Sequence, residues 1–269
     1  MRLSAQNIIV ELAGSVVVDN IDFSVNSGEL VMLVGPNGSG KTSLIRTLCA
    51  ELTPVEGQVL LEDRPVGSWK PIDRAQKMAV LFQQLAVNFP ISVEQLVRLG
   101  RHPFHDDSKV ADGIIDEVLD SMDLTSMAQR SVLSLSGGEQ QRAQIARVLA
   151  QIWRAGSQVD GEMDGELNGV LILDEPLASL DIVYQYQLLE LLQKLVKNGL
   201  SIVLSIHDLN LASLFADRMV LLDKGQVVAA GTSVEVFTQD NIKQVFNQSV
   251  DMIEHPGSGR PQMMYSSRT

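Results

Sequence analysis

Cysteine, aromatic residues and long apolar runs are all scarce in this sequence. One cysteine among 269 residues cannot form an internal disulfide, which favours a reducing compartment. No apolar run approaches the roughly 18 residues that span a bilayer. The N-terminal stretch Met1–Asn7 meets polar residues too early for the apolar core of a signal peptide. We therefore expect a chain that works in the cytoplasm.

Basic residues are also in short supply. The 21 lysines and arginines are outnumbered by 33 acids, which gives a formal net charge of −12. A surface of this sign repels nucleic-acid phosphates and anionic lipid headgroups, so neither nucleic-acid binding nor direct lipid insertion is expected. With 45% hydrophobic and 20% charged residues, the chain has the composition of a globular protein.

Short apolar runs bounded by turn residues alternate with segments of helical period. Leu30–Val34 and Val170–Leu173 predict strands that are buried on both faces of a parallel sheet. Ile182–Lys197 predicts a helix that stops at Gly199, and Leu200–Ile206 predicts the strand that follows. This alternation is typical of an α/β protein with a mostly parallel sheet.

Two segments predict antiparallel pairing instead. Leu3–Val25 has the pattern of short strands broken at Gly14 and at Asp19-Asn20, and Gln58–Leu61 adds another short strand. We expect these to form an N-terminal antiparallel β subdomain. Met219–Ala230 predicts a hairpin with a two-residue loop.

The remaining segments are an insertion, a loop and a tail. Helical period dominates residues 90–153, which predicts an inserted helical subdomain. Residues 154–169 are rich in acids and glycine, and we interpret them as a solvated loop, since a calcium loop would need alternate acids and a closing bidentate Glu. One domain is expected over 1–250, followed by a flexible tail over 251–269.

A glycine-rich segment follows the strand at Leu30–Val34 and opens a helix. It matches the phosphate-binding pattern G-x-x-x-x-G-K-[ST] in the context that this pattern requires. Its glycines let backbone N–H groups turn towards a phosphate at the positive end of the helix. We expect Lys41 to reach the β- and γ-phosphates and the Thr42 hydroxyl to bind Mg²⁺. The candidate ATP-binding residues are Gly35, Pro36, Asn37, Gly38, Ser39, Gly40, Lys41, Thr42 and Ser43.

Two acids end the strand at Val170–Leu173. In open α/β sheets ligands bind at the carboxyl ends of the strands, which is where Asp174 and Glu175 are expected. Asp174 suits a Mg²⁺ ligand, directly or through water. Glu175 can orient an attacking water or take its proton. Either acid alone could instead cap the next helix.

A third motif precedes a long amphipathic helix. Ser136, Gly137, Gly138 and Glu139 form either a second anion-binding helix terminus or simply a serine N-cap. Together with the phosphate loop and the Asp-Glu strand, this segment resembles the signature of the ATP-binding subunit of ATP-binding-cassette (ABC) transporters. The resemblance runs from about Leu3 to about Phe246 and implies the ABC ATPase fold.

The resemblance also implies roles for residues that their own chemistry leaves open. Two subunits of this family dimerise head to tail, so the signature of one acts in trans on the γ-phosphate held by the other. Gln83 matches the glutamine that contacts Mg²⁺ and the attacking water. Asp181 matches the segment that crosses the dimer interface, and His207 matches the γ-phosphate histidine. Leu12 stands where the family usually stacks an aromatic residue on adenine.

The implied function is an ATP hydrolase that drives an importer. ATP binding would close a homodimer and move a membrane permease dimer supplied by a periplasmic or extracellular substrate-binding protein, with this subunit on the cytoplasmic side of the cell membrane. The segment from Leu96 to Pro103 resembles the branch that imports iron chelates, heme and cobalamin. The long interval between the signature and Asp174 is most similar to hemin-import ATPases, so heme is the expected cargo. The alternatives are a ferric-siderophore or cobalamin importer and a soluble ATPase of iron–sulfur cluster assembly.

Overall fold

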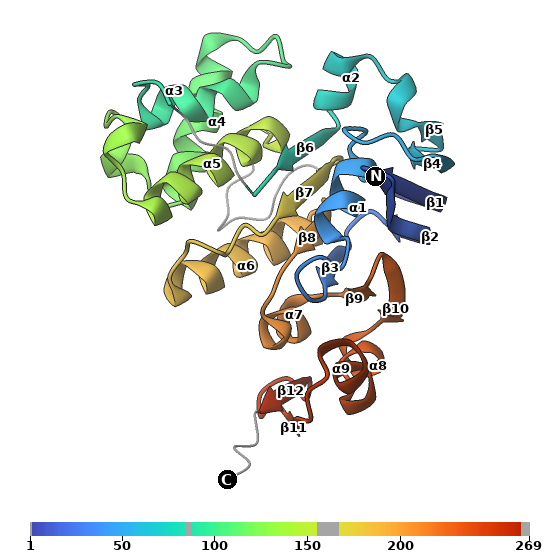
Figure 1. The fold of residues 1–269 in the computed structure, drawn as a ribbon. Helices are drawn as coiled ribbons and strands as arrows, with labels where there is room; N and C mark the ends of the chain where they lie inside the picture. Colours follow the sequence, from blue (N-terminus) through green and yellow to red (C-terminus); the bar gives the residue numbers. More distant parts are fainter. Residues whose placement is uncertain (1, 84–87, 155–166, 265–269) are drawn as a thin grey trace. The chain divides into compact units, whose positions relative to one another are not determined.

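The computed structural model describes residues 2–83, 88–154 and 167–264 (Figure 1). The chain forms two compact units. We call Arg2–Ser68 with Val203–Thr269 the phosphate-loop unit, because it contains the glycine-rich loop, and Trp69–Ile202 the helical unit. The short strand β8 (Ser201–Ser205) is shared between them.

The phosphate-loop unit contains an antiparallel sheet in the order β2-β1-β4-β5. The predicted break at Gly14 is confirmed as the turn between the first two strands. The predicted break at Asp19-Asn20 is wrong, because the strand continues through both residues: Asn20 adopts a left-handed φ of 50° and the pairing register shifts nearby. The strands are β1 (Leu3–Leu12), β2 (Ser15–Val25), β4 (Glu56–Leu61) and β5 (Arg64–Pro65).

The second set of strands in this unit includes a parallel pair. β3 (Leu30–Val34) is buried at every residue and pairs in parallel with β9 (Arg218–Asp223). β10 (Gln226–Gly231) then pairs with β9 in antiparallel fashion, which confirms the predicted hairpin. Both residues of its turn, Lys224 and Gly225, have positive φ, as a two-residue hairpin requires.

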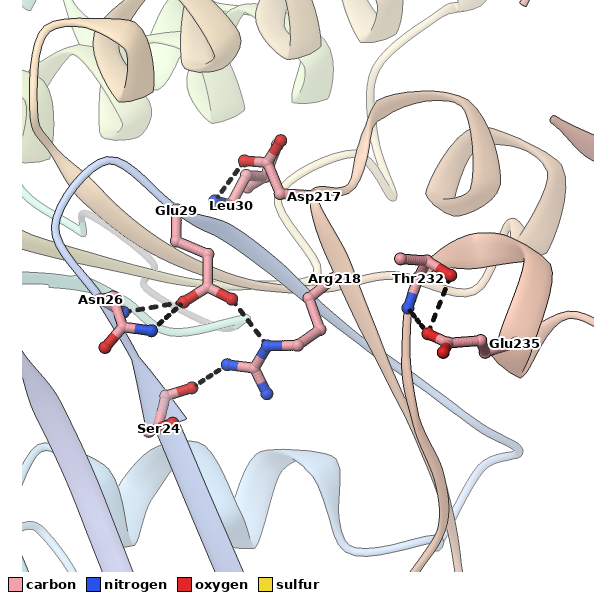
Figure 2. Close-up of polar contacts among 8 residues, drawn as sticks. All are labelled: Ser24, Asn26, Glu29, Leu30, Asp217, Arg218, Thr232 and Glu235. Atoms are coloured by element: carbon pink, nitrogen blue, oxygen red, sulfur yellow. Dashed lines mark hydrogen bonds and ion pairs between the residues drawn. The ribbon is translucent and has the colours of Figure 1, made fainter. Parts of the chain in front are cut away.

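Polar contacts hold the starts of β3 and β9 together (Figure 2). The Glu29 carboxylate forms an ion pair with the Arg218 guanidinium at 2.6 Å and accepts hydrogen bonds from the backbone and side-chain nitrogens of Asn26. Arg218 also donates to the Ser24 carbonyl, and Asp217 accepts the Leu30 N–H at 2.8 Å. These contacts fix the register of the strand that leads into the glycine-rich loop.

The C-terminal segment of the unit forms a β-hairpin. β11 (Asp251–Glu254) pairs in antiparallel fashion with β12 (Pro261–Met264), and this hairpin packs on α7 (Leu209–Phe215). The β11–β12 hairpin therefore occupies residues 251–264 of the expected tail over 251–269, while the last five residues lie outside the described part. The other helices of the unit are α1 (Lys41–Leu48), α8 (Ser233–Val236) and α9 (Gln239–Phe246).

The helical unit combines two parallel strands with most of the helices. β6 (Met78–Leu81) pairs in parallel with β7 (Val170–Asp174), so their carboxyl ends lie at the same edge. Within the predicted insertion at 90–153, all regular elements are helical. This compact unit is wider than that insertion, because α5 also packs on β6. Its helices are α2 (Pro71–Ala75), α3 (Val93–Arg98), α4 (Ser108–Ser121), α5 (Gly137–Ile152) and α6 (Ile182–Lys197).

The end of α5 is held by a buried arginine. Arg101 donates to the carbonyls of Ala150 at 2.7 Å and Trp153 at 3.1 Å, and its charge is balanced by Asp106 at 2.6 Å. A cation at a helix C-terminus satisfies orphan carbonyls and favours the helix dipole. Most of the predicted acidic loop at 154–169, namely 155–166, lies outside the described residues. At its far end Leu167 is buried, so the solvated interpretation is wrong for that residue.

Within the described part of the chain, none of the helices combines the length and the apolar character that crossing a membrane requires.

Candidate functional site

The glycine-rich loop lies between β3 and α1 in a space that excludes side chains. A Cβ on Gly35 would lie 2.2 Å from the Leu222 carbonyl oxygen of β9. A Cβ on Gly40 would lie 2.7 Å from the Val17 carbonyl oxygen, and Gly40 also has a φ of 102°. Glycine is required at both positions because larger residues would clash with backbone, which is less able to move than a side chain.

The loop folds around the side chain of Lys41. This lysine is 5% exposed, and its ammonium donates to the carbonyls of Gly35 at 2.8 Å and Pro36 at 3.0 Å. Helix α1 begins after Gly40 with no side-chain cap and with no acid in its first turn. The amides at this helix start therefore receive no side-chain cap from Gly40, and the local field is positive.

Ser39 contributes a buried hydroxyl to the same loop. The side chain is 2% exposed, and its Oγ has no hydrogen-bond partner among the described residues. Its backbone is fixed from both sides, since its N–H donates to the Pro36 carbonyl and its carbonyl accepts from the Gly225 N–H. The loop conformation thus depends on the β9–β10 turn as well as on its own glycines.

His207 lies in the link between β8 and α7 in the same unit. Before it, the Ile206 N–H donates to the Leu33 carbonyl of β3 at 3.1 Å. After it, Asp208 caps α7 by accepting the N–H groups of Asn210 and Leu211. The histidine side chain is exposed between these two anchors. Leu12, at the end of β1, is also exposed and presents an aliphatic surface.

In the helical unit, the carboxyl ends of β6 and β7 carry polar side chains that meet. Asp174 ends β7 with 1% exposure, and Glu175 follows in the left-handed region at φ 51°. Gln83, two residues beyond β6, donates its side-chain amide to the Glu175 carboxylate. A left-handed φ on a non-glycine residue is a local strain that is enriched at functional sites. Parallel pairing thus brings together two of the predicted residues.

The signature segment starts α5 with a reciprocal cap. The Ser136 Oγ accepts the Glu139 N–H at 3.3 Å, and the Glu139 carboxylate accepts the Ser136 N–H at 2.6 Å. This hydrogen bond from the Ser136 backbone, with a further one from its side chain, lowers the pKa of Glu139 below the usual 4.5. The N-cap interpretation is therefore confirmed for Ser136.

The segment after Glu175 packs against this helix start. The Gln141 side chain donates to the Pro176 carbonyl at 3.0 Å, and a Cβ on Gly138 would lie 3.1 Å from the Ser179 carbonyl oxygen. Asp181 then caps α6 by accepting the N–H groups of Val183 and Tyr184. The structure thus links Glu175, the signature and Asp181 within one unit.

Sequence reasoning missed a charged cluster behind the signature. Arg142 is 4% exposed and stacks on Tyr184 of α6 with 3.9 Å between the guanidinium carbon and the ring centroid. It donates to the carbonyls of Met122 and Asp123, and the Tyr184 hydroxyl donates to the Asp123 carboxylate at 3.0 Å. The available signal was an arginine three residues before Ile145, on the apolar stripe of α5.

Comparison with known proteins shows similarity to ATP-binding-cassette proteins over nearly the whole chain. The ABC transporter family model matches residues 18–153. The hemin import ATP-binding protein HmuV of Pseudomonas aeruginosa is 38% identical over 260 residues, which cover 96% of this chain and 98% of that protein.

Solved structures share the fold. A metal-chelate type ABC transporter in an inward-facing conformation gives a TM-score of 0.74 at 24% identity, covering 97% of this chain and 96% of that one. A dimeric ATP-binding cassette in a post-hydrolysis state, bound to ADP and phosphate, gives 0.72 at 23% identity, covering 86% and 98%. The chain therefore belongs to the ABC transporter family, of which it is an ATP-hydrolysing member.

Proposed function

We propose that this protein hydrolyses Mg·ATP to drive a membrane importer of heme. Similarity to hemin import ATP-binding proteins at 36–39% identity, over 91–98% of the chain, supports this cargo. The catalytic part of the proposal is carried by one observation, the contact of Gln83 with Glu175 at the shared carboxyl edge of β6 and β7.

The phosphate-loop unit would hold the nucleotide. Backbone amides of the loop and of the first turn of α1 would bind the phosphate oxygens, while Lys41 neutralises the β- and γ-phosphates. The lysine is already held over the loop by two carbonyls, so little side-chain entropy remains to be lost on binding. His207 would contact the γ-phosphate. Leu12 offers no ring to stack on adenine, so affinity would depend mainly on the phosphates. The full set of proposed nucleotide-binding residues is Gly35, Pro36, Asn37, Gly38, Ser39, Gly40, Lys41, Thr42 and Ser43.

The donor chemistry suits magnesium. The Thr42 hydroxyl, the Gln83 amide oxygen and the Asp174 carboxylate are hard oxygen ligands of the kind that Mg²⁺ prefers. Among the described residues, no group of three His, Cys, Asp or Glu side chains forms a metal cage. This pattern fits an ion that is held by few protein ligands together with substrate phosphates. When bound, Mg²⁺ would neutralise charge that develops on the phosphate oxygens.

Glu175 would act on the attacking water. Its carboxylate accepts the proton of a water whose oxygen attacks the γ-phosphorus, and ADP leaves with the electron pair of the broken P–O bond. Gln83 holds that carboxylate from β6, which fixes the direction of its oxygens. Asp174 is buried and Glu175 is half-buried with a left-handed backbone, so the two acids have different surroundings and can divide the roles of metal ligand and base.

Coupling to transport would use a head-to-tail homodimer. Ser136, Gly137, Gly138 and Glu139 of one subunit would approach the γ-phosphate bound by the other, with Asp181 at the interface. Because ADP lacks this phosphate, the closed dimer would be favoured only while ATP is intact. Closure would move a permease dimer at the cytoplasmic side of the cell membrane, and a periplasmic or extracellular binding protein would deliver the cargo.

The Glu175→Gln variant tests the catalytic assignment. We expect hydrolysis to fall by at least about 100-fold, the range seen when a general base is removed, while ATP binding is retained. Glu190→Gln, an exposed carboxylate on α6, is the matched control and should hydrolyse ATP normally. Normal hydrolysis by Glu175→Gln would remove this residue from the mechanism. Lys41→Ala should instead lose nucleotide binding itself.

Reconstitution with the permease tests the cargo. Vesicles that contain the importer and ATP should accumulate heme in preference to a ferric siderophore or cobalamin. Preference for one of those ligands would support the proposed transporter function and contradict heme as its cargo. Co-purification with soluble scaffold subunits instead of a polytopic permease would favour the iron–sulfur cluster alternative.

A further inference from the structure

Helix α7 follows His207, and the C-terminal β11–β12 hairpin forms hydrogen bonds with both ends of this helix. At the far end of α7, Arg260 donates to the carbonyls of Ser213 at 2.9 Å, Leu214 at 2.9 Å and Ala216 at 2.8 Å. These are orphan acceptors of the last turn, and a guanidinium there interacts favourably with the helix dipole. Arg260 is half-buried, so water competes only partly for these bonds.

At the near end of α7, the contact is reciprocal. The Met263 N–H donates to the Asn210 side-chain oxygen at 2.7 Å, and the Asn210 side-chain nitrogen donates back to the Met263 carbonyl at 3.2 Å. In the middle of the helix, the buried Ser213 hydroxyl donates to the Pro261 carbonyl at 2.6 Å. A side-chain amide that satisfies both backbone groups of one strand residue fixes both position and rotation of the helix.

Asn210, which the hairpin binds through Met263, lies close to His207 in the chain. Asn210 is three residues beyond the histidine, and its own N–H donates to the Asp208 carboxylate that caps α7. On the other side, Ile206 is fixed to β3 through the Leu33 carbonyl. The conformation of the link that carries His207 is therefore set by β3 at one end and by α7, held by the hairpin, at the other.

The hairpin itself is built to hold Arg260 in place. Its turn is closed by the His255 N–H, which donates to the Arg260 carbonyl at 2.9 Å, and by the Gly259 N–H, which donates to the His255 carbonyl at 2.9 Å. Gly259 has a φ of 68°, a conformation that favours glycine. Figure 1 shows this hairpin at the C-terminal end of the described chain, next to α7.

We infer that Arg260 and Asn210 are positioning residues for His207, and that the C-terminal hairpin is required for fast ATP hydrolysis rather than being a dispensable tail. This inference deepens the proposed function and rests on it, because it assumes that His207 acts on the γ-phosphate. A displacement of about 1 Å at a reacting group can cost up to 100-fold in rate, so a shift of α7 would lower turnover without removing the loop that binds ATP.

The first test measures hydrolysis by the full chain with Arg260→Ala. We expect kcat to fall about tenfold with little change in KM for ATP, since nucleotide affinity depends on the phosphate loop. Arg260→Lys keeps one charged donor at the helix end and should recover part of the loss. Arg64→Ala is the matched control, because this exposed arginine of the same unit lies on β5 and donates hydrogen bonds to Ser68 in its own segment. Unchanged kcat, or a rise in KM that accounts for the loss, would overturn the inference.

A double-mutant cycle separates positioning from general stability. If Arg260 acts through His207, Arg260→Ala should add little further loss in a His207→Ala background. Equal and additive losses in both backgrounds would show that the hairpin acts by another route. The assays are made well below the Tm of each variant, so a loss of folded protein does not count as a loss of turnover.

The second test needs no activity. The ring resonances of the four histidines are recorded by NMR, and the His207 signal is assigned by its absence in His207→Ala. Arg260→Ala and Asn210→Ala should move this signal, whereas Arg64→Ala should not. An unmoved His207 signal in both variants would refute the positioning role even if the wild-type protein hydrolyses ATP. Failure of the wild type to hydrolyse ATP would instead refute the proposed function, and the NMR result would still decide whether the hairpin positions His207.

Discussion

Helices α1 and α5 both have glycine at their start, with Gly40 as the N-cap of α1 and Gly137 as the first residue of α5, yet their first turns differ. The start of α1 has a left-handed glycine, no side-chain cap and no acid, with the ammonium of Lys41 above the loop. The start of α5 is closed by Ser136 and by the Glu139 carboxylate. An incoming phosphate meets uncapped amides and a cation at α1, whereas at α5 it meets a carboxylate that already accepts a backbone N–H. This difference supports the proposal that α1 provides the primary phosphate site and α5 a second, conditional contact.

The largest predicted effect concerns the glycines of the two turns. Gly40→Ala adds a Cβ 2.7 Å from a backbone carbonyl at a left-handed position, which costs about 1–2 kcal/mol in conformation alone, before the clash. We expect a lower Tm. Because the clash would displace the loop amides that face the phosphate, we also expect at least about tenfold weaker ATP binding, a loss of about 1.4 kcal/mol in binding free energy. Gly137→Ala meets open space and should leave the Tm unchanged. Thermal unfolding gives the Tm of each variant, and nucleotide titration gives its affinity for ATP. Equal Tm values for the two variants would show that the α1 turn can relax.

A smaller effect separates the two serines. Ser136→Ala removes the α5 cap and should lower the free energy of unfolding by about 1 kcal/mol. Ser39→Ala removes a buried hydroxyl that lacks a hydrogen-bond partner among the described residues, so stability should change by less than about 0.5 kcal/mol or increase. Urea unfolding midpoints at unchanged m-value give both numbers. A greater loss for Ser39→Ala than for Ser136→Ala would contradict the assignment of Ser136 as a helix cap and of Ser39 as a hydroxyl that makes no stabilising hydrogen bond.

The smallest effect is a pH dependence of the helix start that α5 should show and α1, which has no acid in its first turn, should not. Hydrogen bonds from Ser136 lower the pKa of Glu139 below 4.5, so this carboxylate stabilises the helix start above its unfolded pKa and loses that contribution as the pH falls through the lower folded pKa. An NMR titration of the Glu139 carboxyl carbon, assigned with Glu139→Gln, should give a midpoint below 4.5. A midpoint at or above that value would show that the capping box is open in solution.

The predictions that succeeded from sequence rest on local patterns. The glycine spacing after Leu30–Val34 predicts strand, loop and helix because these conformations need those residue types in that order. The two-residue turn at Lys224-Gly225 is local in the same sense. The predicted break at Asp19-Asn20 failed because neighbouring strands held the chain extended through residues that prefer turns.

Other features depend on partners that are distant in the chain. Residues 255–260 have the composition of a solvated tail. Arg260 is nevertheless held in place by hydrogen bonds to carbonyls at the end of α7, which is distant in the chain. The stacking of Arg142 on Tyr184 likewise joins α5 and α6, and nothing in the sequence of either helix predicts this contact with the other. Composition predicts whether an isolated segment can fold, and it does not predict which backbone carbonyls of a distant helix remain unpaired and can accept its hydrogen bonds.

The sequence by itself determined the α/β class, the phosphate loop with Lys41, and the identity of the residues that end β7. These depend on backbone conformation and on hydrophobic period, which residues within a few positions decide. Tertiary structure alone decided that Gln83 meets Glu175, that the α5 turn packs on the segment after Glu175, and that the C-terminal hairpin holds α7. Each of these needs two segments far apart in sequence to pair hydrogen-bond donors with acceptors, and strand pairing and helix packing bring such segments together only when the chain folds.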